Sequence, residues 1–410
     1  MLSLHEKSVT GSFIDIESQY GAHNYHPLPV VLERGQGVHV WDVEGRRYYD
    51  FLSGYSAVNQ GHCHPKVIQA LAQQAGKLTL TSRAFHNDQL GEYSKYITGL
   101  FGYDKVLPMN TGVEAVETAI KLARKWAYEV KGLPEGTAQV IVCDGNFHGR
   151  TTGVISFSND ESARKNFGPY LPGFTSIPFN DAGALEHALA AENVAAFLFE
   201  PIQGEAGVLV PDAGYLTKVR ELCSRAGVLM IADEIQTGLG RTGKMLACDH
   251  ENVRPDILIL GKALSAGVLP VSAVLADDEI MLTIRPGEHG STYGGNPLAC
   301  KVAIAALEVL QQEGMIANAE TMGRLLREGI RNIGSPYISL VRGKGLLNAI
   351  VIRHDDPEAA WRYCMELMKN GLLAKPTHGD KIRFAPPLPI NESQVAECVD
   401  IIKRSLSALD

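Results

Sequence analysis

The sequence predicts an α/β protein: a large, mostly parallel sheet flanked by helices, with a smaller α+β domain contributed by both ends of the chain. From about residue 102, short continuous apolar runs alternate with helical stretches, which is typical of a parallel sheet covered on both faces. A hairpin pattern precedes this region, and helices with further strands follow it. We therefore expect an N-terminal segment at 1–55, a large domain at 56–302 and a C-terminal part of the small domain at 303–410.

Each element follows from a local pattern. Near the start, VHVWDV and RRYYDF flank Glu44-Gly45 and alternate in polarity, which predicts a β-hairpin. A helix is expected to begin near Thr111, because Val113, Val116 and Ala119 recur at helical spacing. Apolar runs predict strands at 105–109, 139–144, 195–200, 228–233 and 256–260, and later amphipathic stretches predict helices at 297–314, 319–334 and 393–409.

Composition narrows the classes of function. The 410 residues suffice for two or three domains of about 150 residues each. Lys plus Arg number 38 against 46 Asp plus Glu, a net charge of −8, so a nucleic-acid partner is not expected. No apolar run approaches the length of a membrane span. The seven cysteines are dispersed without a C-x-x-C pair, and residues 1–13 have no apolar targeting core; we expect reduced thiols and a cytoplasmic location.

Polar and reactive residues follow the predicted strands at their carboxyl ends, where ligands of open parallel sheets bind. In chain order they are Gly112 and Val113 after the first strand, Phe147 and Arg150 after the second, Glu205 after the third, Asp233 and Gln236 at the fourth, and Lys262 after the fifth. The sequence therefore predicts a single site on this rim.

The helix start at Gly112 and Val113, the carboxylate of Asp233 and the amine of Lys262 can each be interpreted as a functional group or as a structural one. Gly112 and Val113 open a helix and offer N–H groups to a phosphate, although Thr111 could be a helix cap and nothing more. Asp233 could bind a protonated heterocyclic nitrogen, or could cap a helix or form an ion pair. Lys262 lies in an apolar run that would lower its pKa and free a nucleophilic amine, whereas most lysines are surface charges.

Longer motifs resemble a known family. The segments DEIQTGLGRTG (233–243) and GKAL (261–264) resemble the cofactor-attachment region of class III, fold-type I aminotransferases, and the similarity extends over nearly the whole chain. AHNYHPLPVV (22–31) and SGYSAVNQGH (53–62) are similar to the members that act on ornithine. The resemblance implies pyridoxal 5'-phosphate as cofactor. It also implies transfer of the δ-amino group of L-ornithine to 2-oxoglutarate, giving L-glutamate 5-semialdehyde and L-glutamate, in a homodimer or higher homo-oligomer with shared active sites.

The same resemblance implies roles for individual residues. Lys262 would bind the cofactor covalently, and Asp233 would pair with its ring nitrogen. Gln236 would contact the 3′-oxygen of the ring, and Phe147 would stack on the ring face. The phosphate would be held by Gly112, Val113 and the neighbouring subunit's Thr292. For the substrates, Tyr25 and Arg150 would hold the α-carboxylate, Tyr55 would shape the pocket, and Glu205 and Arg383 would form a switch pair. Lys262 and Asp233 are thus the predicted catalytic residues. The chain departs from many ornithine-specific members at His148, where they have Trp.

Rival interpretations remain. Gly238–Gly243 matches G-x-G-x-x-G, the motif of dinucleotide-binding oxidoreductases. However, it does not directly follow a strand and no amphipathic helix comes after it, so this function is not expected. His62-Cys63-His64 lacks a third ligand nearby, so no metal is expected. The Glu205–Arg383 pair could be a structural salt bridge. Within the family, acetylornithine, 4-aminobutyrate, lysine and diamine aminotransferases share the core residues, and Tyr25 is the discriminating position.

Overall fold

A seven-stranded sheet forms the centre of the computed structural model, which describes residues 8–410. Its order is β4-β10-β9-β8-β7-β5-β6; β10 runs antiparallel to both neighbours and the other pairs are parallel. The strands are β4 (Lys105–Met109), β5 (Gln139–Cys143), β6 (Phe174–Ile177), β7 (Val194–Phe199), β8 (Leu229–Asp233), β9 (Ile257–Leu260) and β10 (Ser272–Ala276). The α/β fold with a mostly parallel sheet is therefore confirmed.

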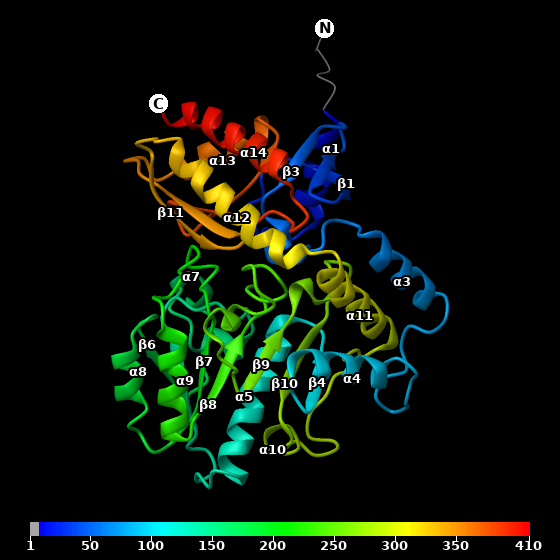
Figure 1. Cartoon of the computed structure of the whole chain (residues 1–410), viewed down its shortest axis with the longest axis vertical. Coiled ribbons are helices and arrows are strands. Elements are labelled where there is room, and N and C mark those ends of the chain that lie inside the picture. Colours follow the sequence, from blue (N-terminus) through cyan, green and yellow to red (C-terminus); the bar gives the residue numbers. More distant parts are fainter. Residues whose placement is uncertain (1–7) are drawn as a thin grey trace.

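Helices cover both faces of this sheet, which explains why its strands are apolar throughout (Figure 1). In β7, Ala196 and Leu198 pack in the core that contains α5 (Gly112–Glu129). Phe197 and Phe199 point to the opposite core, which contains α9 (Tyr215–Ala226). Further helices on or near the sheet are α3 (Pro65–Ala75), α4 (Leu90–Phe101), α6 (Thr152–Ile155), α7 (Glu161–Arg164), α8 (Ala182–Ala188), α10 (Asp278–Met281) and α11 (Pro297–Gln312), with the 3-10 turns Ala247–Glu251 and Lys262–Ser265.

Two four-stranded sheets lie above the central sheet in Figure 1. Their strands are β1 (Leu32–Gln36), β2 (His39–Asp42), β3 (Arg47–Asp50) and β13 (Leu372–Leu373) in one, and β11 (Ile338–Lys344), β12 (Leu347–Ile352), β15 (Lys381–Phe384) and β14 (Pro376–Thr377) in the other. The predicted hairpin corresponds to β2 and β3, which pair antiparallel. The helices here are α1 (Val9–Tyr20), α2 (Ser53–Ser56), α12 (Met315–Asn332), α13 (Ala359–Lys369) and α14 (Glu392–Ser405), with a 3-10 turn at Leu406–Leu409.

A parallel pairing joins the two ends of the chain. Leu372 of β13 pairs with Tyr49 of β3, and the N–H of Phe51 donates to the carbonyl of Leu373 at 2.9 Å. The N-terminal strands are therefore completed by a strand from the last tenth of the chain.

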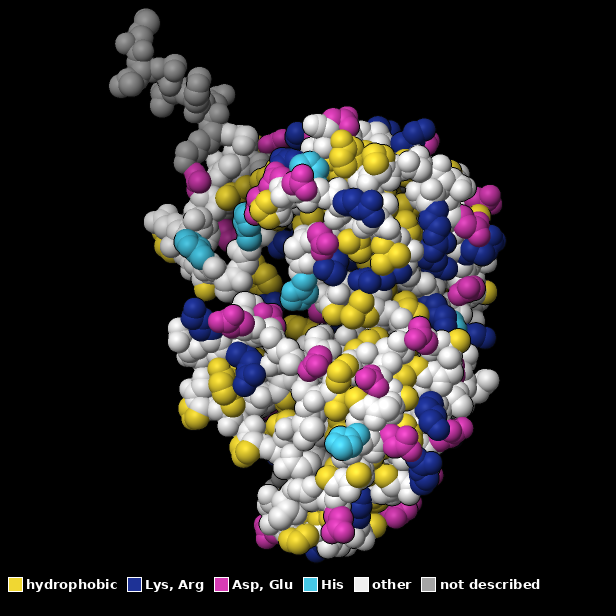
Figure 2. Space-filling model, turned by 90° about the vertical axis from the view of Figure 1, so that its left-hand side faces the viewer, with side chains coloured by type: hydrophobic (Ala, Val, Ile, Leu, Met, Phe, Trp, Pro, Cys, Tyr) yellow, Lys and Arg dark blue, Asp and Glu magenta, His cyan; other side chains and the backbone are white. Residues whose placement is uncertain are grey.

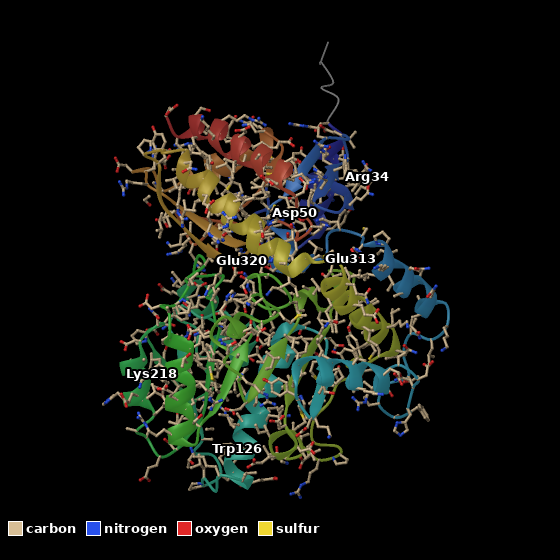
Figure 3. The ribbon with its side chains drawn as sticks, viewed as in Figure 1. Arg34, Asp50, Trp126, Lys218, Glu313 and Glu320 are labelled. Atoms are coloured by element: carbon tan, nitrogen blue, oxygen red, sulfur yellow. The ribbon has the colours of Figure 1, made fainter. Side chains whose placement is uncertain are left out.

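The charged surface and the partners of His62 and His64 bear on nucleic-acid binding and on metal binding. Basic and acidic side chains are interspersed over the face in Figure 2. His62 pairs with Asp50 at 2.7 Å and His64 with Glu313 at 3.1 Å, and these two carboxylates lie apart in Figure 3. Among residues 8–410, no cluster of three or more His, Cys, Asp or Glu side chains could hold a metal ion. Over the same residues, no helix is long and apolar enough to cross a membrane.

Candidate active site

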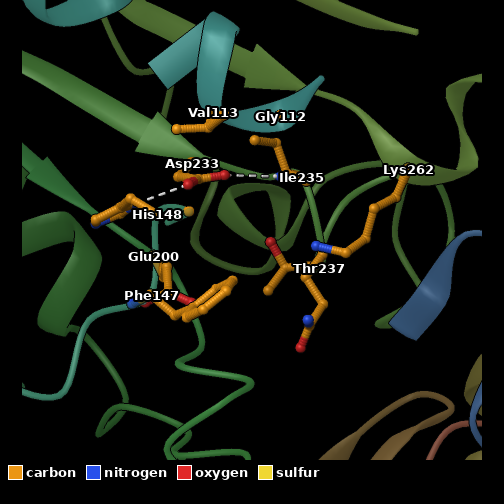
Figure 4. Close-up of a pocket in the computed structure, with 11 residues that line it drawn as sticks. Gly112, Val113, Phe147, His148, Glu200, Asp233, Ile235, Thr237 and Lys262 are labelled. Atoms are coloured by element: carbon orange, nitrogen blue, oxygen red, sulfur yellow. Dashed lines mark hydrogen bonds and ion pairs between the residues drawn. The ribbon is translucent and has the colours of Figure 1, made fainter. Parts of the chain in front are cut away.

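A cavity of about 270 Å³ lies at the carboxyl ends of the central strands (Figure 4). It is lined by Gly112, Val113, Phe147, His148, Gly149, Glu200, Asp233, Ile235, Gln236, Thr237 and Lys262. Every predicted cofactor residue except Thr292 is among them. The structure thus brings together side chains from five separate strand ends.

Lys262 directly follows β9 and Gly261, and its backbone adopts a left-handed conformation with φ of +43°. Such a conformation is strained for a residue with a side chain and occurs often at functional sites. Burial lowers the pKa of the Lys262 amine, although the carboxylates of Asp233 and Glu205 act in the opposite direction. A lowered pKa leaves more of the amine neutral, as a nucleophile requires.

Asp233 ends β8, and both of its carboxylate oxygens have a fixed donor. Oδ1 accepts from the N–H of Ile235 at 3.1 Å, and Oδ2 accepts from Nδ1 of His148 at 2.7 Å. Figure 4 shows these two donors on opposite sides of the carboxylate. Asp233 is 4% exposed, so its carboxylate is largely removed from water.

Glu200 directly follows β7, close to the position that Asp233 has at the end of β8. Its Oε2 accepts the N–H of Phe147 at 3.0 Å, which fixes the loop that carries the aromatic ring. Burial raises the pKa of Glu200 to about 7. Glu200 is the last residue of the strand predicted at 195–200, but no role was predicted from the sequence for it or for His148; the signal available was a carboxylate at the end of a fully apolar run.

The N-terminus of α5 forms another wall of the cavity. Thr111 caps the helix: its hydroxyl accepts from the N–H of Glu114 at 3.4 Å, and Oε2 of Glu114 accepts from the N–H of Thr111 at 2.7 Å. The N–H groups of Gly112 and Val113 have no acceptor within the helix. A Cβ built on Gly112 would lie 3.0 Å from Cδ1 of Ile235, so the absence of a side chain keeps this end of the cavity open.

Arg383 enters the site from β15. Its Nη1 donates to Oε1 of Glu205 at 2.8 Å and to Oε1 of Gln236 at 3.0 Å, while Nε2 of Gln236 donates to Glu205 at 3.1 Å. Burial raises the pKa of Glu205, but the Arg383 guanidinium outweighs burial and the pKa is lowered overall. Glu205 is therefore ionised and covers the positive charge of a guanidinium that is 1% exposed.

The three other predicted substrate residues, Tyr55, Arg150 and Tyr25, lie at the edges of this cluster. The guanidinium of Arg383 lies 5.0 Å from the ring centre of Tyr55, whose φ of +60° falls within a left-handed turn at Ser53–Ser56. Arg150 donates from Nη1 to the hydroxyl of Tyr25 at 3.4 Å, and its guanidinium lies 5.8 Å from the ring centre of Phe147.

Thr292 does not line the cavity and is exposed. Its predicted contribution to the neighbouring subunit's site stays a prediction.

The cavity residues fit pyridoxal phosphate on chemical grounds. A buried amine, an ionisable carboxylate at a strand end, an aromatic side chain and open helix N–H groups correspond to the aldehyde, ring nitrogen, ring face and phosphate of that cofactor. The opening left by Gly112 lies at the helix end where a phosphate would be received.

Comparisons with known proteins agree with this chemistry. The family model "Aminotransferase class-III" matches residues 20–406. The chain is 65% identical to the mitochondrial ornithine aminotransferase of Rattus norvegicus, over 95% of this chain and 89% of that protein. A solved structure of the ornithine aminotransferase from Toxoplasma gondii, described with pyridoxal phosphate partially occupying the active site, superposes with a TM-score of 0.96 at 51% identity, over 98% of this chain and 94% of that one.

A structure of an acetylornithine aminotransferase from Elizabethkingia anophelis is also similar, with a TM-score of 0.89 at 58% identity over 97% of this chain and 99% of that one. Two neighbouring activities within one family therefore share this architecture. The chain belongs to the class III aminotransferase family, in its ornithine aminotransferase branch, and pyridoxal phosphate is its cofactor.

Proposed function

We propose that the cavity around Lys262 is the site at which the chain transfers the δ-amino group of L-ornithine to 2-oxoglutarate, giving L-glutamate 5-semialdehyde and L-glutamate. Ornithine aminotransferase activity follows from the near full-length relatives; the roles of individual residues are our assignments. The observation that supports these roles most directly is the pair of guanidinium groups. Arg383 is neutralised by Glu205, whereas Arg150 contacts only the neutral hydroxyl of Tyr25 among its described side-chain hydrogen bonds.

That difference orients the first substrate. An α-carboxylate is attracted to the guanidinium without an anionic partner, so Arg150 and Tyr25 would bind the α-carboxylate of ornithine. The δ-amine, at the other end of the molecule, is then directed toward Lys262. Glu205 prevents Arg383 from capturing the carboxylate and turning the α-amine inward.

The second substrate needs the opposite arrangement. 2-Oxoglutarate must bring its keto carbon, which lies beside a carboxylate, to the same reacting position. Movement of Glu205 away from Arg383 would free the guanidinium for that carboxylate. Tyr55, beside Arg383, would bound the space that this carboxylate enters.

Lys262 and Asp233 carry the chemistry. When bound, pyridoxal phosphate supplies a carbonyl that binds amines covalently and a ring that accepts electrons. Lys262 would hold the cofactor through its amine and, once displaced by substrate, would move the proton between substrate and cofactor carbons. Asp233 would hold the ring nitrogen, and Phe147 would cover the ring face.

A substrate panel tests the proposal against the acetylornithine alternative. Purified holoenzyme would be assayed for semialdehyde formation with L-ornithine, N-acetyl-L-ornithine and 4-aminobutyrate at matched concentrations of 2-oxoglutarate. We expect the highest kcat/KM with ornithine, because Tyr25 and Arg150 face a free amino acid head group. A higher kcat/KM with N-acetylornithine would reject the ornithine assignment.

We also propose a homodimer in which Thr292 completes the neighbouring subunit's phosphate site. Thr292 is exposed in its own chain, while Ser291 beside it accepts from Nδ2 of Asn110 at 2.7 Å, close to the start of α5. Mixing a Lys262→Ala dimer with a Thr292→Asp dimer after mild dissociation should restore activity, because one site of each hybrid has both native residues. An active monomer in light scattering, or no recovery from an exchanged hybrid, would contradict this.

The domain division is a proposal as well. We assign 1–55 and 303–410 to one small domain and 56–302 to the large one, on the basis of the β3–β13 pairing. The boundary at 302/303 falls inside α11 (Pro297–Gln312), so a division after Gln312 suits the helix better. Limited proteolysis that cuts near Gly314 and leaves α11 with the large fragment would support that refinement.

For location, we propose the cytoplasm. The six buried cysteines and exposed Cys63 are all free in the described chain, as in a reducing compartment. Relatives such as the rat protein are named mitochondrial, and the matrix is also reducing. Imaging the natural full-length product with a C-terminal tag separates the two; mitochondrial fluorescence would reject the cytoplasmic proposal.

A further inference from the structure

His148 is one of the buried polar side chains of the cavity that the proposed reaction does not use. Its side chain is 0% exposed and lies in the loop after β5, next to Phe147. Nδ1 bonds Oδ2 of Asp233 at 2.7 Å, whereas no hydrogen-bond partner for Nε2 is found within residues 8–410. A buried imidazole with such a contact to a catalytic carboxylate calls for a physical account.

The surroundings of His148 are anionic. Asp233 faces it from the end of β8 and Glu200 from the end of β7, and both carboxyl groups stabilise a charged imidazole. Lys262, after β9, acts on the same carboxylates from the other side of the cavity. Phe157 is an apolar neighbour, with ring centres 6.0 Å apart. Burial lowers the pKa of His148, but the hydrogen bond to Asp233 and the charges of Asp233 and Glu200 together outweigh burial, and the pKa is raised overall.

We propose that His148 is a positioning residue which, as an imidazolium ion, keeps the carboxylate of Asp233 ionised and oriented to hold the ring nitrogen of the cofactor. With the N–H of Ile235 on Oδ1 and His148 on Oδ2, rotation of the carboxylate is restricted at both oxygens. The positive charge offsets the repulsion that Glu200 would otherwise exert on an ionised Asp233. Glu200 in turn sustains the imidazolium. The inference rests on the proposed role of Asp233.

The first test measures the charge of His148 without relying on turnover. In protein with isotope-labelled histidine, NMR titration should show one imidazole that stays protonated well above the ordinary histidine range and disappears in His148→Phe. Asp233→Asn should lower the pKa of that imidazole strongly, and Glu200→Gln by less. A neutral His148 across this range would overturn the inference.

The second test measures cofactor binding. His148→Phe removes both donor and charge, whereas His148→Asn retains a neutral donor near the position of Nδ1. We expect the Kd for pyridoxal phosphate to rise about tenfold or more in His148→Phe, because a hydrogen bond to a charged group is lost, and to rise less in His148→Asn. The increase in His148→Phe should grow as pH falls, because Asp233 without its cationic partner is protonated more readily.

Phe157→Leu is the matched control for packing, because it alters a neighbour of the imidazole without touching the polar network. If Phe157→Leu and His148→Phe raise the Kd equally and with the same pH profile, His148 is a packing residue and the inference fails. Asp233→Asn separates this from failure of the proposed function: unchanged cofactor binding and activity in that variant would reject the role of Asp233 itself. If His148→Phe does not fold, the comparison of His148→Asn with wild type still decides the question.

Discussion

Replacing Glu205 with Gln should change which half of the reaction the chain favours. The substitution retains the length of the side chain and an oxygen acceptor for Nη1 of Arg383, now 2.8 Å from Oε1, but removes the negative charge. At an effective dielectric constant of about 20, unit charges about 4 Å apart attract by about 4 kcal/mol. An incoming carboxylate must replace that attraction before it can use Arg383.

The size of the expected change in kcat/KM follows from the loss of the anionic competitor for Arg383. A hydrogen bond to a charged group contributes about 1.5–3 kcal/mol, and we take this range as the advantage that a substrate carboxylate gains when its anionic competitor is absent. This corresponds to a rise of about 10- to 150-fold in kcat/KM for the glutamate half-reaction. The ornithine half-reaction should stay level or fall, because an uncovered Arg383 also attracts the α-carboxylate of ornithine in the unproductive direction.

Stopped-flow single-turnover measurements separate the two halves, with ornithine added to the pyridoxal form and glutamate added in parallel. Glu205→Asp is the control because it retains the charge on a shorter side chain. If Glu205→Gln alters both halves by the same factor, or leaves glutamate unchanged, the pair is a structural salt bridge and the switch is wrong.

Three further predictions follow from the site. Lys262→Ala should abolish turnover and the covalent link to the cofactor, which borohydride reduction and mass spectrometry would detect in wild type; near-normal activity would reject the assignment. Tyr25→Ile should reduce kcat/KM for ornithine by about ten- to a hundredfold through loss of a hydrogen bond to a charged group, with a much smaller effect on 2-oxoglutarate; equal losses would make Tyr25 a packing residue. The pKa of Glu200 is raised to about 7 from 4.5, so Glu200 binds its proton more tightly in the folded state than in the unfolded state. Its contribution to the free energy of unfolding is therefore complete below about pH 4.5 and is lost as pH rises through about 7. Calorimetric Tm values of Glu200→Gln should therefore decline less than those of wild type between about pH 5 and 8, and parallel curves would contradict this.

The strand ends made much of the site predictable. Lys262, Asp233 and Phe147 follow apolar runs whose parallel arrangement brings their carboxyl ends to one edge, and this needs no knowledge of side-chain geometry. The antiparallel strand β10 was not predicted, because SAVLA contains two alanines and a serine, which indicate a strand less strongly than the Ile, Val and Leu of the neighbouring runs.

Contacts between residues far apart in the sequence were harder to predict from the sequence. The bond from His148 to Asp233 depends on the path of the loop at 144–149, which apolar periodicity does not encode. The resemblance to a family suggested the contact between Arg383 and Glu205, but its geometry depends on the register of β15 against β12, in which Arg383 pairs with Ala349. Tyr55 reaches Arg383 only because Ser53–Ser56 turns left-handed, a conformation that local propensity disfavours.

The pairing of β3 with β13 has a consequence for how a newly made chain matures. Leu372 is synthesised about 320 residues after Tyr49, and at about 5–20 residues per second this interval lasts about 15–60 s. During that time the outer edge of β3 lacks its native neighbour and can pair with another extended chain. Conditions that crowd nascent chains should therefore promote intermolecular strand pairing at this N-terminal edge first. A chain that ends before residue 371 would leave the edge of β3 unpaired permanently.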